Sequence, residues 1–343
     1  MSGRNRTIYD IAAEAEVSIT TVSRVLRGQS SVSPATRARV EAVIAKHQYR
    51  PSSIARGMTS KRTDTIGIIL PRISNPNYAM IFDGAVEEAR KNGLGTTLFP
   101  WQSLLLQDNG AQMLTERRLD GVILYVEYLP DEDREHLVQT LAELRQYMPV
   151  VLIGSVPSCL DYPTVYYDMA ALMRRVMDSL IALGHERIAM IGGAEADRDE
   201  FRRDVGYDEK IREARLPMIS SYRVFCQGTA EAGETALDRI LSSLKREYWP
   251  TAVIALNDLV GMGVMASARR HGLCLPEDLS VVGCDNLFCA PYLTPALTSI
   301  DLRQQQLGAR AVQLLLSGEK HREEADWELV VRDSCAAPPT HPV

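Results

Sequence analysis

The first apolar residues of the chain recur at the spacing of an amphipathic helix. They fall at i, i+3, i+4 and i+7, with acidic residues on the opposite face, so one side of the helix can be buried. This stripe consists of Ile8, Ile11, Ala12 and Ala15. Thr7 and Asp10 stand three residues apart at its start, a pair suited to satisfying the free amides of a first helical turn. The pattern predicts a short, capped helix.

A second short helix is predicted after a turn at Val17 and Ser18. Ser18 can cap this helix, and Val22, Val25 and Leu26 supply its apolar face. Its outward positions carry small hydroxyls, one aliphatic side chain and two arginines. This outward set is Ile19, Thr20, Ser23, Arg24 and Arg27.

Such a polar face suits the major groove of DNA. There Arg can hold guanine bidentately, and Thr or an aliphatic side chain can meet a thymine methyl group. An ordinary amphipathic helical hairpin with a solvated polar face is the alternative reading of these residues.

A third helix is predicted from Ser33 as its cap and Pro34 as its first residue, with Val40, Val43 and Ile44 as its buried stripe. Residues 51–58 then form a candidate helix of barely two turns. So short a segment, with Gly57 inside it, does not hold a helix alone in water. We expect it to order only when something docks against it.

From Thr65 onward, continuous apolar runs alternate with amphipathic helical patterns. The runs are 66–70, 121–125, 150–153, 188–191, 252–256 and 279–282. Apolar strands interleaved with helices indicate parallel sheets covered on both faces, and the number of such units favours two α/β lobes. A break at residues 161–163 is the expected crossing point between the lobes.

Charge is distributed unevenly along the 343 residues, whose net charge is -6. Residues 1–62 carry a balance of +7 and residues 63–343 a balance of -13. A basic head on an acidic body suggests a polyanion-binding module attached to another domain. The six cysteines show no metal-ligand spacing and are read as scattered small thiols. No signal peptide or membrane-spanning run is visible, so a cytoplasmic location is expected.

Ligands of parallel α/β sheets bind beyond the carboxyl ends of the strands. Polar side chains follow four of the predicted strands, and they offer an amide, a carboxylate, a guanidinium and an aromatic face. The candidate stretches are Ser74-Asn-Pro-Asn-Tyr78, the arginines Arg198, Arg202 and Arg203, Asn257-Asp258 and Gly283-Cys-Asp-Asn286. These groups suit vicinal hydroxyls and a flat apolar wall. For each residue alone, helix capping or a solvated loop is the competing explanation. Asp168 is expected to be such a helix cap.

No constellation for catalysis or for a cofactor is apparent. Gly261-Met-Gly263-Val-Met-Ala266 matches a dinucleotide fingerprint, but four residues separate it from the preceding strand, so it is read as a chance match. His185 is expected in a turn before a strand. The chain is therefore predicted to be no enzyme and to need no cofactor or metal.

Taken together, these segments resemble the LacI/GalR (lactose-repressor) family of bacterial transcription regulators from Thr7 to about Ser334. The resemblance is carried by motifs in a fixed order. They are Thr7-Ile-x-Asp-Ile-Ala, Val17-Ser-x-x-Thr-Val-Ser-Arg24-Val-Leu, Tyr49-Arg-Pro51, Ala55-Arg56, Thr65-Ile-Gly-Ile, Asp120-Gly-Val-Ile, Gly184-His-x-Arg-Ile188, Arg203-x-x-Gly-Tyr207, Asn257-Asp258, Leu275-Pro-x-Asp-x-Ser-Val-Val-Gly-x-Asp285 and Leu293-Thr-Pro-Ala-Leu-Thr-Ser-Ile300.

The resemblance implies a helix-turn-helix headpiece (1–50), a hinge helix and linker (51–63) and a core like a type I periplasmic binding protein (64–343). It implies a first lobe of about 64–164 and 295–325, a second lobe of about 165–294 and 326–335, and a loose tail (336–343). Implied partners are double-stranded DNA with a near-palindromic operator, a small, sugar-like effector and a second copy of the chain in a homodimer. No membrane contact is implied.

Position by position, the resemblance gives roles to individual residues. The implied DNA contacts are Ser18, Ile19, Thr20, Ser23, Arg24, Arg27, Ala55, Arg56 and Met58, and the implied effector contacts are Asn77, Tyr78, Arg203, Asn257 and Asp285. Three positions depart from the family pattern: Gly57 in the hinge, Met58 where Leu is usual, and Gly154 where many relatives have an acidic ligand. Two rivals stay open, a sugar-processing enzyme with a DNA-binding head and a cytosolic solute-binding protein.

Overall fold

The computed structural model describes residues 6–26, 31–47, 49, 62–101, 110–126, 131–157, 159–193 and 203–340. The chain divides into two compact units, Met1–Asp64 and Thr65–Val343. Among the described residues, no helix is both long and apolar enough to cross a membrane.

The first unit contains the three predicted helices, α1 (Ile8–Glu14), α2 (Ile19–Leu26) and α3 (Pro34–His47). Its core is small and consists of the predicted stripes. Ile11, Ala12, Ala15, Val22, Val25 and Val40 are buried, and Ile8, Leu26, Val43 and Ile44 pack against them. The helical spacing read from the sequence is thus confirmed for all three helices.

The predicted caps are also present. The backbone amide of Thr7 donates to Asp10 Oδ2 at 2.7 Å, and the amide of Asp10 donates to Thr7 Oγ1. Ser18 Oγ accepts from the amide of Thr21 at 3.2 Å, and Ser33 Oγ accepts from the amide of Thr36 at 3.3 Å. Each short helix therefore begins where its capping hydroxyl satisfies an otherwise free amide.

Glu14 at the end of α1 ties that helix to the end of α3. Its carboxylate accepts from Lys46 Nζ at 2.8 Å and lies 2.6 Å from His47 Nε2. Hydrogen bonds from Lys46 and His47 lower the pKa of Glu14. These contacts hold α1 and α3 together in addition to the small core of six buried side chains.

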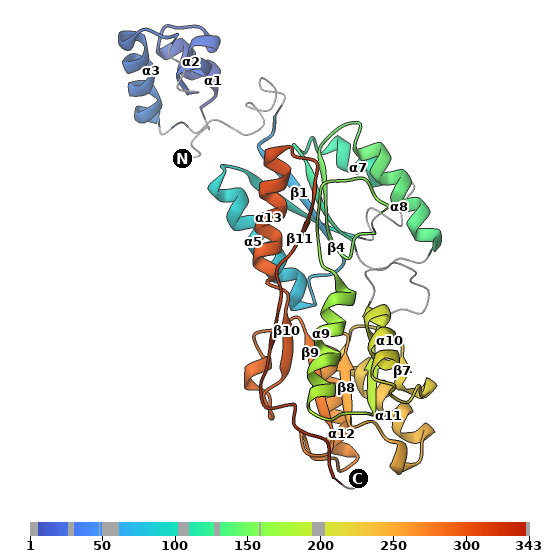
Figure 1. The fold of residues 1–343 in the computed structure, drawn as a ribbon. Helices are drawn as coiled ribbons and strands as arrows, with labels where there is room; N and C mark the ends of the chain where they lie inside the picture. Colours follow the sequence, from blue (N-terminus) through green and yellow to red (C-terminus); the bar gives the residue numbers. More distant parts are fainter. Residues whose placement is uncertain are drawn as a thin grey trace. The chain divides into compact units, whose positions relative to one another are not determined.

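Two six-stranded sheets form the second unit, and Figure 1 shows them as two lobes. The first has the order β11-β5-β4-β3-β1-β2, with every pairing parallel. Its strands are β1 (Thr65–Leu70), β2 (Gly95–Pro100), β3 (Val122–Val126), β4 (Val150–Gly154), β5 (Thr164–Tyr166) and β11 (Arg322–Glu324).

The second sheet has the order β12-β10-β9-β8-β6-β7, and it is parallel except that β12 pairs antiparallel with β10. Its strands are β6 (Ile188–Ile191), β7 (Arg223–Val224), β8 (Ala252–Ala255), β9 (Ser280–Cys284), β10 (Thr298–Asp301) and β12 (Glu328–Val330). All six apolar runs identified in the sequence are strands, and the prediction of two parallel-sheet lobes is confirmed.

Helices cover both faces of each sheet, which explains why the strands are continuously apolar. They are α5 (Pro76–Lys91), α7 (Gly110–Glu116), α8 (Asp131–Leu144), α9 (Met169–Ala182), α10 (Arg203–Glu213), α11 (Ala230–Ser243), α12 (Asp258–Arg270) and α13 (Gln304–Ser317). Alternate strand residues enter different cores: Ile68 and Ile123 lie in one cluster, while Ile69 and Leu124 lie in another. The first of these clusters continues into the second lobe through residues such as Ile188.

Two lobe boundaries expected from the sequence are wrong. Strand β5 pairs with β4, so the chain stays in the first sheet through Tyr166 and crosses after that residue, not at residues 161–163. Residues 298–301 were expected in the first lobe, yet β10 pairs with β9, with Thr298 opposite Val282. Strands β5 and β10 are short, and the apolar pattern does not say which sheet a short strand joins.

The tail was expected to be loose, but its first residue is anchored. The amide of Ala336 donates to Ser280 Oγ at 3.1 Å, and its carbonyl lies 2.9 Å from His185 Nε2. His185 is buried in the turn between α9 and β6, as predicted, and its Nδ1 lies 2.9 Å from Thr251 Oγ1. The histidine therefore joins three chain segments at the base of the second sheet.

This buried histidine should make stability depend on pH. Burial lowers the pKa of His185 below its ordinary value of 6.5, so the folded state binds fewer protons than the unfolded state just below pH 6.5. The stability that neutral His185 contributes to the fold is fully present above pH 6.5 and is lost as the pH falls through its lowered pKa. Urea unfolding followed by tryptophan fluorescence at pH 5.0 and 7.5 should show a smaller loss on acidification in His185→Gln than in wild type.

The matched control is His321→Gln, because the His321 side chain is 44% exposed. The control should keep the wild-type pH dependence. Identical pH dependence in His185→Gln and wild type would contradict the assignment.

Candidate functional site

The candidate DNA-reading face lies on α2 and its cap. Ser18, Ile19, Thr20 and Arg24 are exposed, and Ser23 is half-buried. Ile19 is notable because 40% of this large apolar side chain is exposed although the headpiece core is small. The buried face of the same helix, Val22 and Val25, holds it against α1 and α3, so the polar face is presented outward.

Four implied DNA contacts fall outside the described residues. They are Arg27, Ala55, Arg56 and Met58, and Gly57 lies among them. Their roles remain predictions.

In the second lobe, Arg203 connects the ends of two strands. It is the first residue of α10, and its Nη1 donates to the carbonyl of Leu256, directly after β8. Its Nη2 donates to Cys284 Sγ, at the end of β9, at 3.3 Å. Since Leu256 precedes Asn257 and Cys284 precedes Asp285, the guanidinium brings three of the predicted effector residues to one place.

Asn257 has a capping role that the sequence left open. Its Oδ1 accepts from the amide of Val260 at 2.8 Å, so it caps α12, and its Nδ2 donates to the carbonyl of Gly228 at 3.2 Å. These bonds use one lone pair of Oδ1 and one hydrogen of Nδ2. The side-chain amide can therefore still donate one hydrogen bond and accept another.

Asp258, the next residue, holds the turn that carries Asp285. It is completely buried, its Oδ2 accepts from the amide of Leu287 at 2.6 Å, and its Oδ1 accepts from Ser299 Oγ at 2.5 Å. The turn needs this support because Asp285 and Asn286 both have positive φ angles, 106° and 48°. Burial raises the pKa of Asp258 to about 6, against the smaller lowering effect of its two hydrogen bonds.

In the first lobe, Asn77 and Tyr78 are buried in the first turn of α5, directly beyond the end of β1. The Tyr78 ring meets the Tyr125 ring edge-on, with 5.1 Å between centroids and 78° between planes. Tyr125 belongs to β3, the neighbour of β1, so the two rings form an aromatic wall at the carboxyl edge of the sheet.

Tyr167 links this wall to the second lobe. Its hydroxyl donates to the carbonyl of Leu302, which follows β10. Burial raises the pKa of Tyr167 well above its ordinary value, and smaller contributions come from Tyr125 on one side and from Cys284 and Asp285 on the other. The five predicted effector residues therefore lie around one junction between the strand ends.

Sequence reasoning missed several residues of this junction. Tyr125 is the last residue of a predicted strand, so its position at the carboxyl edge of the sheet could have been predicted from the sequence. Tyr167 and Gln304 gave no such signal, because their positions depend on how the two lobes meet.

Two hollows on the surface of the second unit lie elsewhere. One of about 350 Å³ lies between α5, α13 and β11, and a smaller one of about 170 Å³ lies beside it along α5 and α13. Neither is lined by a predicted effector residue. Segments 102–109, 127–130 and 194–202, which follow strands β2, β3 and β6, lie outside the described residues, as do Arg198 and Arg202.

Gly154 is required by the backbone at the end of β4. Its φ angle is 99°, and a Cβ atom there would lie 2.8 Å from the carbonyl oxygen of Val126 and 2.9 Å from Tyr125 Cζ. The acidic side chain expected here from the family pattern cannot occupy this position without a change of backbone and ring.

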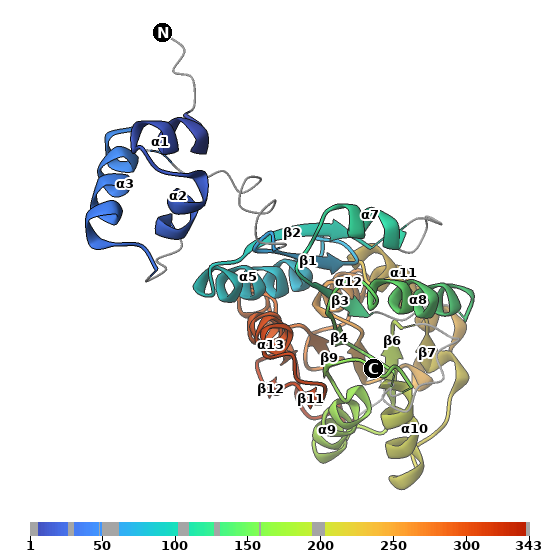
Figure 2. The same ribbon diagram turned by 90° about the horizontal axis from the view of Figure 1, so that it is seen from above.

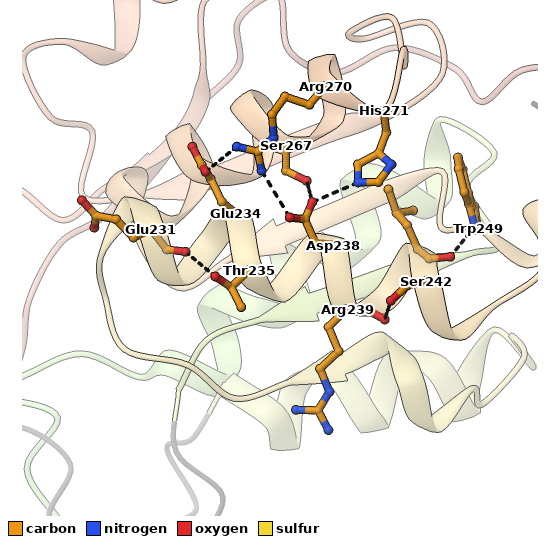
Figure 3. Close-up of polar contacts among 11 residues, drawn as sticks. Glu231, Glu234, Thr235, Asp238, Arg239, Ser242, Trp249, Ser267, Arg270 and His271 are labelled. Carbon is orange, nitrogen blue, oxygen red and sulfur yellow. Dashed lines mark hydrogen bonds and ion pairs between the residues drawn. The ribbon is translucent and has the colours of Figure 1, made fainter.

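A serine, an aspartate and a histidine lie together on the outer helices α11 and α12, but they are not arranged as a serine nucleophile beside a histidine base (Figure 3). Ser267 Oγ donates to Asp238 Oδ1, and His271 Nε2 lies 3.0 Å from the same oxygen. The carboxylate lies between the hydroxyl and the imidazole, so the imidazole cannot take the serine proton. The trio, with Arg270, joins the two helices.

The glycines of the apparent dinucleotide fingerprint lie inside α12. A Cβ on Gly263 would collide with the carbonyl of Ala230 at the start of α11, so this glycine permits close helix packing. The reading of the fingerprint as a chance match is therefore confirmed.

Comparison with known proteins identifies the chain. Residues 7–52 match the family of bacterial regulatory proteins of the lacI type, and residues 177–335 match a periplasmic binding protein-like domain. Catabolite control protein A of Priestia megaterium is 33% identical over 335 residues, which cover 95% of this chain and 96% of the relative. This chain belongs to the LacI family.

Other relatives of this LacI-family chain are also DNA-binding regulators. The transcriptional repressor PurR of Edwardsiella ictaluri is 33% identical over 346 residues, 97% of this chain and 98% of the relative. The transcriptional repressor CytR of Escherichia coli K12 is 29% identical over 340 residues, 97% of each chain.

Solved structures agree with this assignment. A lac repressor dimer bound to operator and the anti-inducer ONPF has a TM-score of 0.85 and 25% identity, over 97% of this chain and 100% of that one. A complex of the transcriptional regulator CelR with cellobiose has a TM-score of 0.70 and 28% identity, over 96% and 99% of the two chains. The chain is thus a DNA-binding transcriptional regulator of the LacI family.

The buried carboxyl group of Asp258 gives a stability prediction. Its folded pKa of about 6 lies above its ordinary value of 3.8, so the folded state binds more protons than the unfolded state between these values. The stability that protonated Asp258 contributes to the fold is fully present below pH 3.8 and is lost as the pH rises through 6. The free energy of unfolding of wild type relative to Asp258→Asn should fall by up to about 3 kcal/mol between pH 4 and pH 8.

Urea unfolding of both proteins across this range measures the difference. Asp326→Asn is the control, because Asp326 is exposed. A difference between wild type and Asp258→Asn that stays constant with pH would refute the raised pKa.

Proposed function

We propose that this LacI-family chain is a ligand-responsive, sequence-specific repressor of a catabolic operon, and that its effector is a sugar or sugar derivative. It binds a near-palindromic operator as a homodimer. Residues 1–50 form the headpiece, 51–63 the hinge and linker, and 64–343 the effector-binding core. The single observation that carries the proposal is the convergence of five predicted effector residues at one junction of a core attached to a helix-turn-helix headpiece.

The polar face of α2 supports sequence reading by the headpiece. Arg24 offers a guanidinium suited to guanine, while Ile19 and Thr20 offer apolar contacts to a thymine methyl group. The +7 balance of residues 1–62 supplies phosphate attraction. In this proposal Arg56 and Met58 of the hinge contact the minor groove, with Met58 as a wedge.

The chemistry of the junction supports a polar, ring-shaped effector. The rings of Tyr78 and Tyr125 offer an aromatic wall, while Arg203, Asn257 and Asp285 offer donors and acceptors from the facing lobe. Sugars combine apolar ring faces with vicinal hydroxyls, and both suit this set. The cellobiose in the related CelR complex is consistent with this class.

The mechanism we propose is a population shift. A ligand that prefers one arrangement of the lobes biases the core toward it and changes how the hinges of two protomers meet on DNA. The coupling between the ligand and DNA equals the difference in ligand affinity for the two arrangements, typically about 1–3 kcal/mol.

Two experiments on the full-length chain test this function. Thermal unfolding against a panel of sugars, sugar acids and nucleobases identifies a ligand, and selection from random duplex DNA with and without that ligand identifies the operator. Turnover of the ligand would favour the enzyme rival. Absence of salt-dependent DNA binding would favour the solute-binding rival.

Arg24→Ala should relax base preference, because it removes a bidentate contact worth about 1–3 kcal/mol of discrimination. Arg56→Ala should instead weaken binding to all sequences with little change of preference. Site selection with wild type and both variants compares these outcomes. Unchanged site selection in Arg24→Ala would rule out base reading by this residue.

Arg203→Ala should abolish the effector response and leave operator affinity within about threefold of wild type. The variant loses the guanidinium that joins the ends of β8 and β9, whereas the headpiece is unaltered. Fluorescence anisotropy with the selected duplex, with and without the panel ligand, measures both quantities. A normal response in Arg203→Ala would remove this residue from the effector site.

A further inference from the structure

Two buried amide side chains keep an oxygen with no hydrogen-bond donor among the described residues. They are Asn77, which is 5% exposed, and Gln304, which is 1% exposed, and the oxygens are Asn77 Oδ1 and Gln304 Oε1. Buried carbonyl-type oxygens are nearly always paired in folded proteins, because an unpaired one loses its hydration without replacement. Two such oxygens beside the strand ends point to a partner that supplies donors.

Both side chains come from the first turns of two helices that lie side by side in Figures 1 and 2, α5 in cyan and α13 in orange-red. The helices approach closely: a Cβ on Gly84 would collide with the carbonyl of Gln305, and a Cβ on Gly308 with that of Ile81. Further along both helices, Gln313 Nε2 donates to Glu88 Oε1 at 3.1 Å.

The helices cross near Gly84 and Gly308, and the later residues Glu88 and Gln313 are also paired, so the two helices run in the same direction. Their first turns therefore lie at the same end, and for α5 that end is the carboxyl edge of the first sheet. Asn77 and Gln304 consequently both belong to the junction between the lobes.

Gln304 also reaches the second lobe. Its Nε2 donates to the backbone carbonyl of Asp285, immediately after β9. This bond fixes the orientation of the amide group, because the nitrogen is held by Asp285 and the oxygen must point elsewhere. The neighbouring contact from the Tyr167 hydroxyl to the carbonyl of Leu302 holds the same part of the chain. Gln304 is thus a fixed acceptor between the two halves of the proposed effector site.

We infer that Gln304 is an effector contact, and that the effector is a neutral, hydroxyl-rich molecule that donates hydrogen bonds to Gln304 Oε1 and Asn77 Oδ1. The inference rests on the proposed effector site and names its ligand class. A ligand that offers only acceptors, such as a small dicarboxylate, would leave both amide oxygens unpaired. A ligand with vicinal hydroxyls can satisfy both while it accepts from Arg203.

Matched probes and variants of the full chain test this inference. The neutral probes are D-glucose, cellobiose and adenosine, and the donor-free probe is fumarate at pH 7.5. At least one neutral probe should raise the melting temperature of wild type, and fumarate should not. The affinity for that neutral probe should fall about tenfold in Gln304→Leu, because one buried hydrogen bond is lost. Gln306→Leu is the control, since Gln306 is exposed on the same helix, and its affinity should stay within about twofold of wild type.

Three outcomes would overturn the inference. They are a melting shift by fumarate alone, no shift by any of the three neutral probes, or equal affinity in wild type and Gln304→Leu. Failure of wild type to select any DNA would instead defeat the proposed function and leave the ligand result intact.

A measurement without ligand separates effector contacts from core residues. Leu has the same branching as Asn, so Asn77→Leu removes the unpaired acceptor and keeps the branched shape of the side chain. The ligand-free variant should melt at or above the wild-type temperature, whereas a purely structural Asn77 would give a decrease of more than about 5 °C. Such a decrease would overturn the role of Asn77 as an effector contact.

Discussion

The completely buried carboxyl group of Asp258 determines the shape of the part of the proposed effector site that lies in the second lobe. Asp258 binds the amide of Leu287 and the hydroxyl of Ser299, so it fixes the turn that carries Asp285. Gly283 must be a glycine for the same reason, because a Cβ there would collide with Asp258 Oδ1. An ionised carboxyl group in this position is costly, and the fold tolerates the cost to hold two consecutive residues at positive φ.

The same turn connects the two lobes. Gln304 donates to the carbonyl of Asp285, while Arg332 donates to Asn286 Oδ1 and to the carbonyl of Leu297, each at 2.6 Å. Gln304 begins a helix that packs on the first sheet, so one hydrogen bond links Asp285 of the second lobe to the first lobe. In the proposed mechanism, a small molecule at this junction favours one lobe arrangement over another, which is what regulation of a separate DNA-binding unit requires.

The parts of the fold that the sequence predicted are those in which one local signal decides the structure. Apolar runs such as 66–70 and 188–191 are buried on both faces and could only be central strands. Thr7, Ser18 and Ser33 caps were readable from spacing. The short strands β5, β11 and β12 were not, because three polar or mixed residues carry no periodicity. The proposed effector residues were predicted from strand ends and family motifs, whereas the positions of Gln304 and Tyr167 depend on contacts between distant segments.

The central claim is that a ligand in the core and an operator on the headpiece alter each other's affinity. Calorimetry tests this claim most directly. In the first experiment, the panel ligand is titrated into the full-length chain, once without DNA and once with the chain saturated by its selected duplex. In the second, the duplex is titrated into the chain with and without the ligand. The account predicts that both affinities change by the same factor, about 5- to 150-fold. Ligand affinity that is identical with and without the operator duplex would contradict it.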